Sequence, residues 1–317
     1  MHASTAPYGG FLRTYLAPQR TRMAVLAALM LADLALQLGL PRVVQTFIDR
    51  AMAGSDLRTL LGIGVAYFIV ALAQSWTLVG CQYVAQNVGL TATNRIRADL
   101  TLHCLRLDMG FHTQRTPGEM IERVDGDVGK LENFLSQFLV QVVLNGLLLL
   151  GVLVLLALID WRVGLPSAVS VLVAAGSARL LTKRLARYST RERQASAELF
   201  GLLEERLSGT EDIRANGAVG YVLRRHIERS RQLFRASVAR AAWGVVSWRS
   251  LNMAITIGGI LSLIIGAFLA LDGTITVGQV YLIFAYTNML SRPVEELMRQ
   301  LDDLQQATAS IGRVQEL

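Results

Sequence analysis

The chain has 317 residues, of which 52% are hydrophobic and 17% are charged, and its formal net charge at pH 7 is +7. Soluble domains usually carry about 25% charged residues, so this balance indicates a membrane protein. The basic residues gather beside apolar runs, which argues against a nucleic-acid partner and favours a lipid bilayer with Lys and Arg on its cytosolic side.

The cysteine and histidine content argues against a disulfide framework and a metal centre. The chain has two cysteines, Cys81 and Cys104, in or just beyond one apolar run, and four scattered histidines. A metal site needs a cluster of ligands, and a disulfide-built fold needs more cysteines. We therefore expect no bound metal and two inert thiols.

The N-terminal segment, residues 1–19, precedes an apolar run that begins at Met23. Several arginines stand before that run and no small-residue cleavage site ends it, so we expect a retained first span with a cytosolic N-terminus. Apolar residues at helical spacing within 8–16 are compatible with a short helix in the membrane interface and equally with an irregular tail.

Six apolar stretches follow, and each can cross about 30 Å of hydrocarbon when it is roughly 20 residues long. Three connections between them are short, whereas more than fifty residues separate the second stretch from the third and more than sixty separate the fourth from the fifth. The stretches are 23–47, 57–80, 134–159, 163–181, 245–271 and 277–291.

The distribution of Lys and Arg predicts the orientation. Residues 82–133 contain six of them and residues 182–240 contain thirteen, whereas the short connections 51–56, 160–161 and 271–276 contain none, although Arg50, Arg58 and Arg162 stand at their edges. Cytosolic connections are enriched in these residues. We therefore expect two intracellular hairpins, short external turns, and both termini in the cytosol of a multi-pass protein of the cell (inner) membrane.

The two long connections are predicted to be helical. Proline is missing before Pro117 in the first and throughout the second, and apolar residues recur at helical spacing. As one helix, residues 57–108 would measure about 75–80 Å, more than twice the hydrocarbon thickness. We expect the extensions to pack as a cytosolic bundle. The apolar positions on the second hairpin are Leu199, Leu202, Leu203, Leu207, Leu223, Ile227, Phe234 and Val238.

A short polar segment lies at the tip of the first hairpin. Thr116 can cap a helix, Pro117 suits the first helical position, and Glu119 stands where a capping box places its acid. Gly118 and Arg123 belong to the same segment. A helix this short is marginal alone in water, so we expect it to dock onto something.

The second hairpin is expected to reverse where two glycines and an asparagine interrupt the helical pattern. The residues are Asn216, Gly217, Ala218, Val219, Gly220 and Tyr221. On spacing alone, the two tips either close their hairpins and do no more, or form a matched pair of contacts for a cytosolic partner.

The last short connection contains a second capping-box pattern, Thr276 with Gln279, which starts the final apolar stretch. Pro293 is expected to kink or break the helix beyond it. Residues 292–317 are polar and helix-prone, and we expect them to form an exit helix.

Several polar residues fall within the apolar stretches. Asp33 lies about 16 Å into the first one, where a charge costs at least about 2.5–3.5 kcal/mol on insertion scales. It either lines a substrate path, with Gln37 one turn away, or is satisfied by a polar group of a neighbouring helix. Asn145, Asn252 and Asn288 are further pathway candidates, although such amides more often join helices.

Four segments resemble the transmembrane domain of ATP-binding cassette (ABC) exporters of the six-helix type. Residues 111–127 resemble the family's first intracellular loop at Gly118-Glu119, Arg123 and Asp127. Residues 160–162 (DWR) resemble its outer turn, and residues 204–215 (EERLSGTEDIRA) resemble the segment before its second coupling helix. Residues 273–279 (GTITVGQ), followed by Pro293 and 306–313, resemble its sixth helix and the exit from it.

The resemblance implies an all-α membrane fold with six transmembrane helices, long cytosolic extensions and two coupling helices. It further implies a domain-swapped dimer with an identical or a different second transmembrane domain. The hairpin tips would be the coupling helices, and the second would touch the partner's nucleotide-binding domain. ATP and Mg²⁺ would bind those domains and drive an alternating-access cycle, usually for export.

The sequence contains no recognisable ATP-binding motor. A phosphate-cradling loop of the form GxxxxGK[ST] requires Gly-Lys, and the one such pair, Gly129-Lys130, is followed by Leu131. We therefore expect neither ATP hydrolysis nor a bound cofactor in this chain alone. The nucleotide-binding domain would be fused in a longer protein or be a separate chain.

Two other classes of protein compete with this interpretation. A mitochondrial-type carrier has three repeats with P-x-[DE]-x-x-[KR], but here Glu122 and Met298 occupy the basic position and no hundred-residue repeat occurs. A membrane signalling or scaffold module, whose cytosolic bundle recruits a partner without transport, is the stronger rival. An adjoining or continuing reading frame with ATP-binding motifs would distinguish a permease from it.

Overall fold

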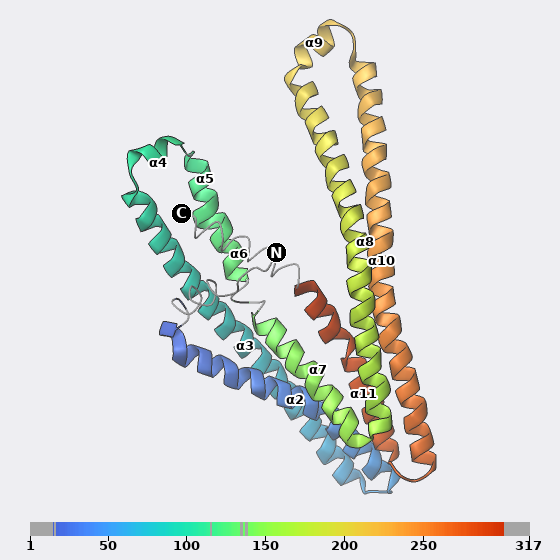
Figure 1. Cartoon of the computed structure of the whole chain (residues 1–317). Coiled ribbons are helices and arrows are strands. Elements are labelled where there is room, and N and C mark those ends of the chain that lie inside the picture. Colours follow the sequence, from blue (N-terminus) through green and yellow to red (C-terminus); the bar gives the residue numbers. More distant parts are fainter. Residues whose placement is uncertain (1–14, 16, 115, 134–135, 137–138, 301–317) are drawn as a thin grey trace. The chain divides into compact units, whose positions relative to one another are not determined.

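The computed structural model describes residues 15, 17–114, 116–133, 136 and 139–300. In this part of the chain all regular structure is helical (Figure 1). The all-α prediction is therefore confirmed. The elements are η1 (Ala17–Gln19), α2 (Arg20–Met52), α3 (Leu57–Arg106), α4 (Met109–Gln114), α5 (Pro117–Ile121), η2 (Glu122–Asp127), α6 (Val128–Asn133), α7 (Leu139–Ile159), α8 (Trp161–Ser208), α9 (Thr210–Ala215), α10 (Val219–Leu271) and α11 (Val277–Met289).

The chain divides into two compact units. Unit 1 comprises Met1–Ser167 and Gly259–Leu317, and unit 2 comprises Ala168–Gly258. Unit 2 therefore contains most of α8, the whole of α9 and most of α10, while the remaining helices belong to unit 1.

Five helices in the described ranges are long and apolar enough to cross a membrane, as a multi-pass protein requires. Helix α3 runs for 50 residues without interruption, and α8 and α10 have 48 and 53 residues. At 1.5 Å per residue these helices measure about 70–80 Å, more than twice the hydrocarbon thickness. The prediction of very long helices is confirmed for α3, α8 and α10, which contain the second, fourth and fifth apolar stretches. Helix α7, in the third stretch, has 21 described residues.

The sixth predicted span corresponds to α11, which has 13 residues and is shorter than the roughly 20 that cross a bilayer. It ends at Met289, a turn follows at Leu290, and helical structure resumes over 291–300. The interruption fits the expected effect of Pro293, because its ring collides with the carbonyl group four residues earlier and it has no N–H to donate. Residues 301–317, the rest of the predicted exit helix, lie outside the described residues.

Helices α7 and α8 are joined by a single residue. The Asp160 carboxylate accepts the backbone N–H of Arg162 at 2.7 Å and so caps the start of α8. The turn brings the helices into close contact, since a Cβ added at Gly164 would lie 2.8 Å from the Cα of Ala157. The external turn predicted at this place is therefore as short as the sequence indicated.

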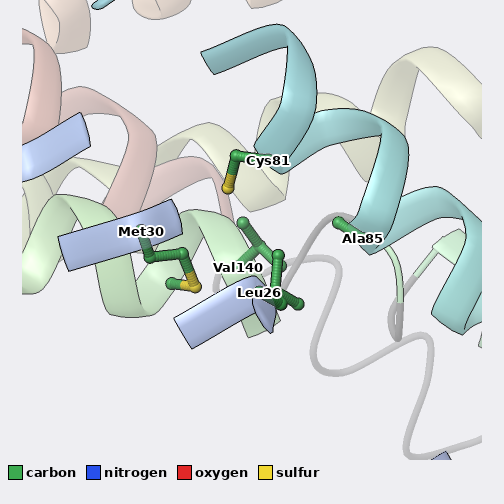
Figure 2. Packing of buried hydrophobic residues seen from close by; sticks show 5 residues of the cluster. All are labelled: Leu26, Met30, Cys81, Ala85 and Val140. Carbon is green, nitrogen blue, oxygen red and sulfur yellow. The ribbon is translucent and has the colours of Figure 1, made fainter. Parts of the chain in front are cut away.

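Unit 1 has an apolar core in which α2, α3 and α7 meet. Figure 2 shows that side chains of all three helices point toward one another. Leu26 and Met30 come from α2, Cys81 and Ala85 from α3, and Val140 from α7. Both cysteines of the chain, Cys81 and Cys104, are buried.

Two buried polar contacts also join helices of unit 1. The hydroxyl group of Tyr286 in α11 donates to the carbonyl oxygen of Leu38 in α2 at 2.8 Å. The hydroxyl groups of Ser167 and Ser262 lie 2.9 Å apart, and Ser262 also donates to the carbonyl of Val163. In hydrocarbon, where water cannot pair with these groups, such contacts hold helices together.

Unit 2 is an antiparallel pair of long helices, α8 and α10, which lie side by side with α9 at their far end (Figure 1). The Arg229 guanidinium contacts the Glu198 carboxylate at 2.7 Å, and Arg240 pairs with Glu192. Only part of the predicted apolar face lies between these helices. Leu199 is buried, whereas Leu207, Leu223, Ile227, Phe234 and Val238 are exposed.

Candidate coupling segments

The first hairpin tip is built from short helices that follow the end of α3 (Figure 1). Thr116 has extended backbone angles, and its side-chain oxygen accepts the backbone N–H of Glu119 at 3.3 Å. Pro117 begins α5, whose first turn has no intrahelical acceptor for an N–H group. The predicted helix start at Thr116 is therefore confirmed.

Charged side chains fix the tip to itself and to α3. The Arg123 guanidinium lies 3.0 Å from the Glu119 carboxylate, one helical turn away. The Arg97 guanidinium of α3 forms ion pairs with two acidic residues on the returning side of the hairpin. It lies 3.3 Å from Asp125 in η2 and 3.4 Å from Glu132 in α6. The sequence did not identify Arg97, because a partner 28 or 35 residues away leaves no local pattern.

An apolar cluster lies beneath the tip. Ile96 of α3 packs with Val128 and Leu131 of α6, and Tyr15 and Leu100 contact this cluster. Burial of such side chains is worth roughly 1.5–3 kcal/mol each relative to exposure. The cluster therefore joins α3 and α6 into one stiff arm.

The segment between α5 and α6 is a π-helical turn, η2. A Cβ added at Gly126 would lie 2.6 Å from the carboxylate at the end of the Glu122 side chain, which would have to move. Such single π turns are rare and often occur at functional sites. Gly126 is the one feature of the sequence that could have indicated the turn.

The first tip exposes apolar side chains to its surroundings. Leu105, Met109 and Ile121 are 77%, 75% and 66% exposed. Glu119 is also exposed, and the Arg123 side chain is 13% exposed. An exposed apolar patch bordered by charge is typical of a surface that binds another protein.

The second tip follows the end of α8. Gly209 interrupts the helix, α9 adds six residues, and the chain reverses through 216–218 with Gly217 at a φ of +60°. The Ala218 N–H donates to the carbonyl of Ile213 at 2.9 Å, and the Asn216 side chain donates to the carbonyl of Asp212 at 2.8 Å. Glycine serves here because other residues avoid positive φ.

The predicted extent of the second tip differs from the structure in one respect. Asn216, Gly217 and Ala218 form the reversal, but Val219, Gly220 and Tyr221 already belong to the first turns of α10. The short helix lies before the reversal, at α9. Val219 and Tyr221 are exposed, as is Leu207 near the end of α8. This tip therefore also presents apolar side chains.

Each tip is closed by hydrogen bonds between residues close together in the chain. The Thr116 side chain caps the start of α5, and at the second tip the Ala218 N–H and the Asn216 side chain donate to carbonyl groups of α9. Within the described ranges, no group of three or more His, Cys, Asp and Glu side chains could hold a metal ion.

Asp33, the charged residue predicted at membrane depth, is 4% exposed. Gln74 of α3 hydrogen-bonds its carboxyl group, whereas Oδ1 has no partner among the described atoms. Gln37 is half-buried on the same helix. Gln74 therefore satisfies part of the Asp33 carboxyl group, and both roles of Asp33, in a substrate path or between helices, stay predictions.

The three predicted pathway asparagines have local partners. Each side-chain amide donates to the carbonyl group four residues earlier in its own helix: Asn145 to Gln141 at 2.8 Å, Asn252 to Trp248 at 3.1 Å and Asn288 to Phe284 at 2.9 Å. Such local bonds satisfy part of an amide's hydrogen-bonding capacity inside a helix. None of these three contacts joins two of the candidates.

Comparison with known proteins agrees with this architecture. YgaD of Bacillus subtilis (strain 168), named as a candidate multidrug export ATP-binding/permease protein, is 23% identical over 308 residues, which cover 95% of this chain and 53% of YgaD. YfiC of the same organism is named as an uncharacterised ABC transporter ATP-binding protein. It is 23% identical over 304 residues, which cover 95% of this chain and 50% of YfiC. SAOUHSC_02003 of Staphylococcus aureus (strain NCTC 8325) is also named as a candidate multidrug export ATP-binding/permease protein. It is 24% identical over 268 residues, which cover 80% of this chain and 45% of that protein.

The chain thus spans about half the length of the curated relatives that it matches. The family model described as the ABC transporter transmembrane region matches residues 23–294, which contain all the apolar helices and both hairpin tips. The chain belongs to the ABC transporter transmembrane region family.

Proposed function

We propose that this chain is the permease domain of an ABC exporter, and that it transmits motion from ATP-binding domains through its two hairpin tips. The observation that carries the proposal is that α3, α8 and α10 are far longer than a bilayer is thick and that each hairpin tip carries a short helix with exposed apolar side chains on or beside it. A protein that only crossed the membrane would have no use for helices about 70–80 Å long, more than twice the hydrocarbon thickness.

The proposed topology has six transmembrane helices, with α11 and its flanks as the sixth. The two hairpins, 82–133 and 182–240, would lie in the cytosol because Lys and Arg are concentrated in them. Both termini would lie on the same side of the cell (inner) membrane. The external turns would be the short connections around residues 53–56, 160 and 272–276.

The proposed partners are a nucleotide-binding domain and a second transmembrane domain, identical or different. ATP and Mg²⁺ would be held by the nucleotide-binding domain. The relatives named as ATP-binding/permease proteins are about twice as long as this chain, which supports a fused or separate motor of that kind. Dimer formation would complete a translocation pathway of which this chain lines one half.

The coupling role is tested by neutralising the charged pair at the first tip. The double substitution Glu119→Gln/Arg123→Gln, in the transporter assembled with its ATP-binding domain, should lower substrate transport while ATP hydrolysis continues. The expected loss follows because the pair holds the exposed surface of the tip in place. Transport and ATPase rates are measured in the same reconstituted vesicles.

A matched control is the partly exposed pair Glu198–Arg229, which joins α8 to α10 within unit 2 and belongs to neither tip segment. Glu198→Gln/Arg229→Gln removes the same charges and should leave coupling intact. Unchanged transport and substrate-stimulated ATPase activity in the tip variant would overturn the proposal and favour a scaffold module that recruits partners without transport.

A further inference from the structure

Helix α8 carries five basic side chains close together just after its apolar stretch. They are Arg179, Lys183, Arg184, Arg187 and Arg191, and we call them the α8 basic face. All five are exposed. Four of them, at positions 179, 183, 187 and 191, recur every four residues, which places their side chains one above another on the helix surface.

The position of this face along α8 matches the edge of a bilayer. Between Arg162 and Arg179 the sequence has 16 residues without a charge, and between Arg249 and the end of α10 it has 22. These lengths correspond to about 24 Å and 33 Å of helix, close to the roughly 30 Å of hydrocarbon. The basic face therefore begins where phospholipid headgroups would lie.

Aromatic side chains hold part of the basic face in a fixed place. The rings of Tyr188 and Trp243 stack at 5.6 Å and connect α8 to α10 within unit 2. Arg184 lies over the Trp243 ring and Arg191 over the Tyr188 ring, each at 5.7 Å from the ring centre. Such cation–π contacts and interfacial aromatics are typical of the headgroup level of a membrane.

The face has no acidic side chains to neutralise it. On α8 no Asp or Glu occurs between Asp160 and Glu192, and on α10 none occurs after Glu228. Among the residues that the structure describes, no ion pair involves Arg179, Lys183 or Arg187, whereas Arg229 and Arg240 farther along the hairpin are paired. The three unpaired cations attract an anion at one level of the helix pair.

We propose that Arg179, Lys183 and Arg187 bind the phosphate group of an anionic phospholipid in the cytosolic leaflet. The exposed apolar surface that adjoins the cations suits acyl chains, which a soluble phosphate compound lacks. That surface consists of Leu172, Val173, Leu180, Val245 and Val246. The inference rests on the orientation in the proposed function, but it requires neither ATP nor transport.

The proposal is tested by native mass spectrometry of the full chain released from mixed micelles with equal amounts of phosphatidylglycerol and phosphatidylcholine. The wild-type chain should retain phosphatidylglycerol preferentially. Each neutralising substitution, Arg179→Gln, Lys183→Gln or Arg187→Gln, should weaken that preference about fivefold, and the triple variant should abolish it. Helix content measured by circular dichroism reports whether the variants fold.

Two controls separate a specific site from overall charge. The triple variant Arg224→Gln/Arg231→Gln/Arg235→Gln removes the same charge from exposed positions of α10 nearer the second tip, and it should keep the preference. The variant Arg179→Lys/Arg187→Lys keeps the positive charges and should also keep the preference for phosphatidylglycerol. Equal losses in both triple variants, or no lipid preference in the wild type, would overturn the proposal.

A third arm distinguishes a lipid from a free anion. Excess inorganic phosphate should leave phosphatidylglycerol bound, because the acyl chains contribute to its retention. Displacement of the lipid by inorganic phosphate would overturn the assignment and identify a soluble-anion site instead. Lipid retention is independent of substrate movement, so a negative result here leaves the transport proposal standing.

Discussion

The carboxylate of Asp49, near the end of α2, accepts the backbone N–H of Gly278 at the start of α11, with 2.9 Å from N to Oδ1. The Thr276 hydroxyl donates to the other carboxylate oxygen at 3.0 Å. A negative charge at a helix N-terminus is favourable, because the first N–H groups have no partner inside the helix. Asp49 thus joins the first and last apolar helices of the described chain.

Gly278→Ala should destabilise unit 1, because an added Cβ would lie 2.5 Å from Oδ1 of Asp49 and 2.6 Å from the carbonyl oxygen of Gln45. The expected loss is about 1–3 kcal/mol, the usual cost of overpacking. Thermal unfolding in detergent measures it. Gly62→Ala is the control, since nothing lies within 4 Å of that position and its unfolding temperature should not fall. Equal behaviour of the two variants would contradict the tight junction.

Tyr286→Phe should lower stability by about 0.5–1.5 kcal/mol, the net value of a typical buried hydrogen bond. The substitution keeps the ring of this fully buried residue and removes the hydroxyl that donates to Leu38. The exposed Tyr67 offers a comparison, because Tyr67→Phe removes a hydroxyl that is not buried and should be neutral. A Tyr286→Phe protein as stable as the wild type would show that the bond between α11 and α2 contributes nothing.

Asp33→Asn should fold at least as well as the wild type and keep its transport profile. The amide can still pair with Gln74, and a neutral group costs less than a carboxylate at membrane depth, where insertion of Asp costs about 2.5–3.5 kcal/mol. Unfolding temperature and a substrate panel in vesicles are the measurements. A normally folded Asp33→Asn protein with altered transport would return Asp33 to the substrate path.

Tyr15 gives a prediction for alkaline pH. Burial raises the pKa of its hydroxyl above the ordinary value of 10.0, and so does Asp99, which accepts its hydrogen bond at 3.0 Å. Because the folded state favours the protonated phenol, the contribution of Tyr15 to stability is complete below about pH 10 and decreases as the pH rises through the folded pKa. The stability difference between the wild type and Tyr15→Phe should therefore be constant up to about pH 10 and shrink above it. Denaturant titrations across that range measure it, and a difference that grows with pH would contradict the assignment.

Features that depend on neighbouring residues could be predicted from the sequence. The capping box of Thr276 and Gln279 forms as expected, and so does the cap at Thr116, because donor and acceptor lie three residues apart. The long helices were also predictable, since hydrophobic spacing without proline or turn residues leaves few alternatives. The extent of α3 differs from the expected 57–108 by two residues.

Features that join distant parts of the chain could not be predicted in the same way. Asp49 and Gly278 are 229 residues apart, and nothing near either residue indicates the other. At the second tip the glycine pattern at 216–221 indicated the reversal of the chain but not the short helix before it. That helix, α9, follows the break at Gly209. Tyr15 is the described member of the predicted interfacial segment 8–16; the other residues of that segment lie outside the described residues.

The most direct measurement of the central claim, that both hairpin tips face the cytosol and the ATP-binding partner, is labelling of single cysteines with a membrane-impermeant thiol reagent. Cysteines would be introduced as Gly118→Cys and Ala215→Cys at the tips, and as Ala53→Cys and Asp272→Cys in the external turns, after replacement of Cys81 and Cys104 by serine. All four positions are exposed. The account predicts labelling of 53 and 272 in intact cells, and of 118 and 215 only in inverted vesicles, where an added ATP-binding partner should protect them. Labelling of either tip in intact cells would contradict the account.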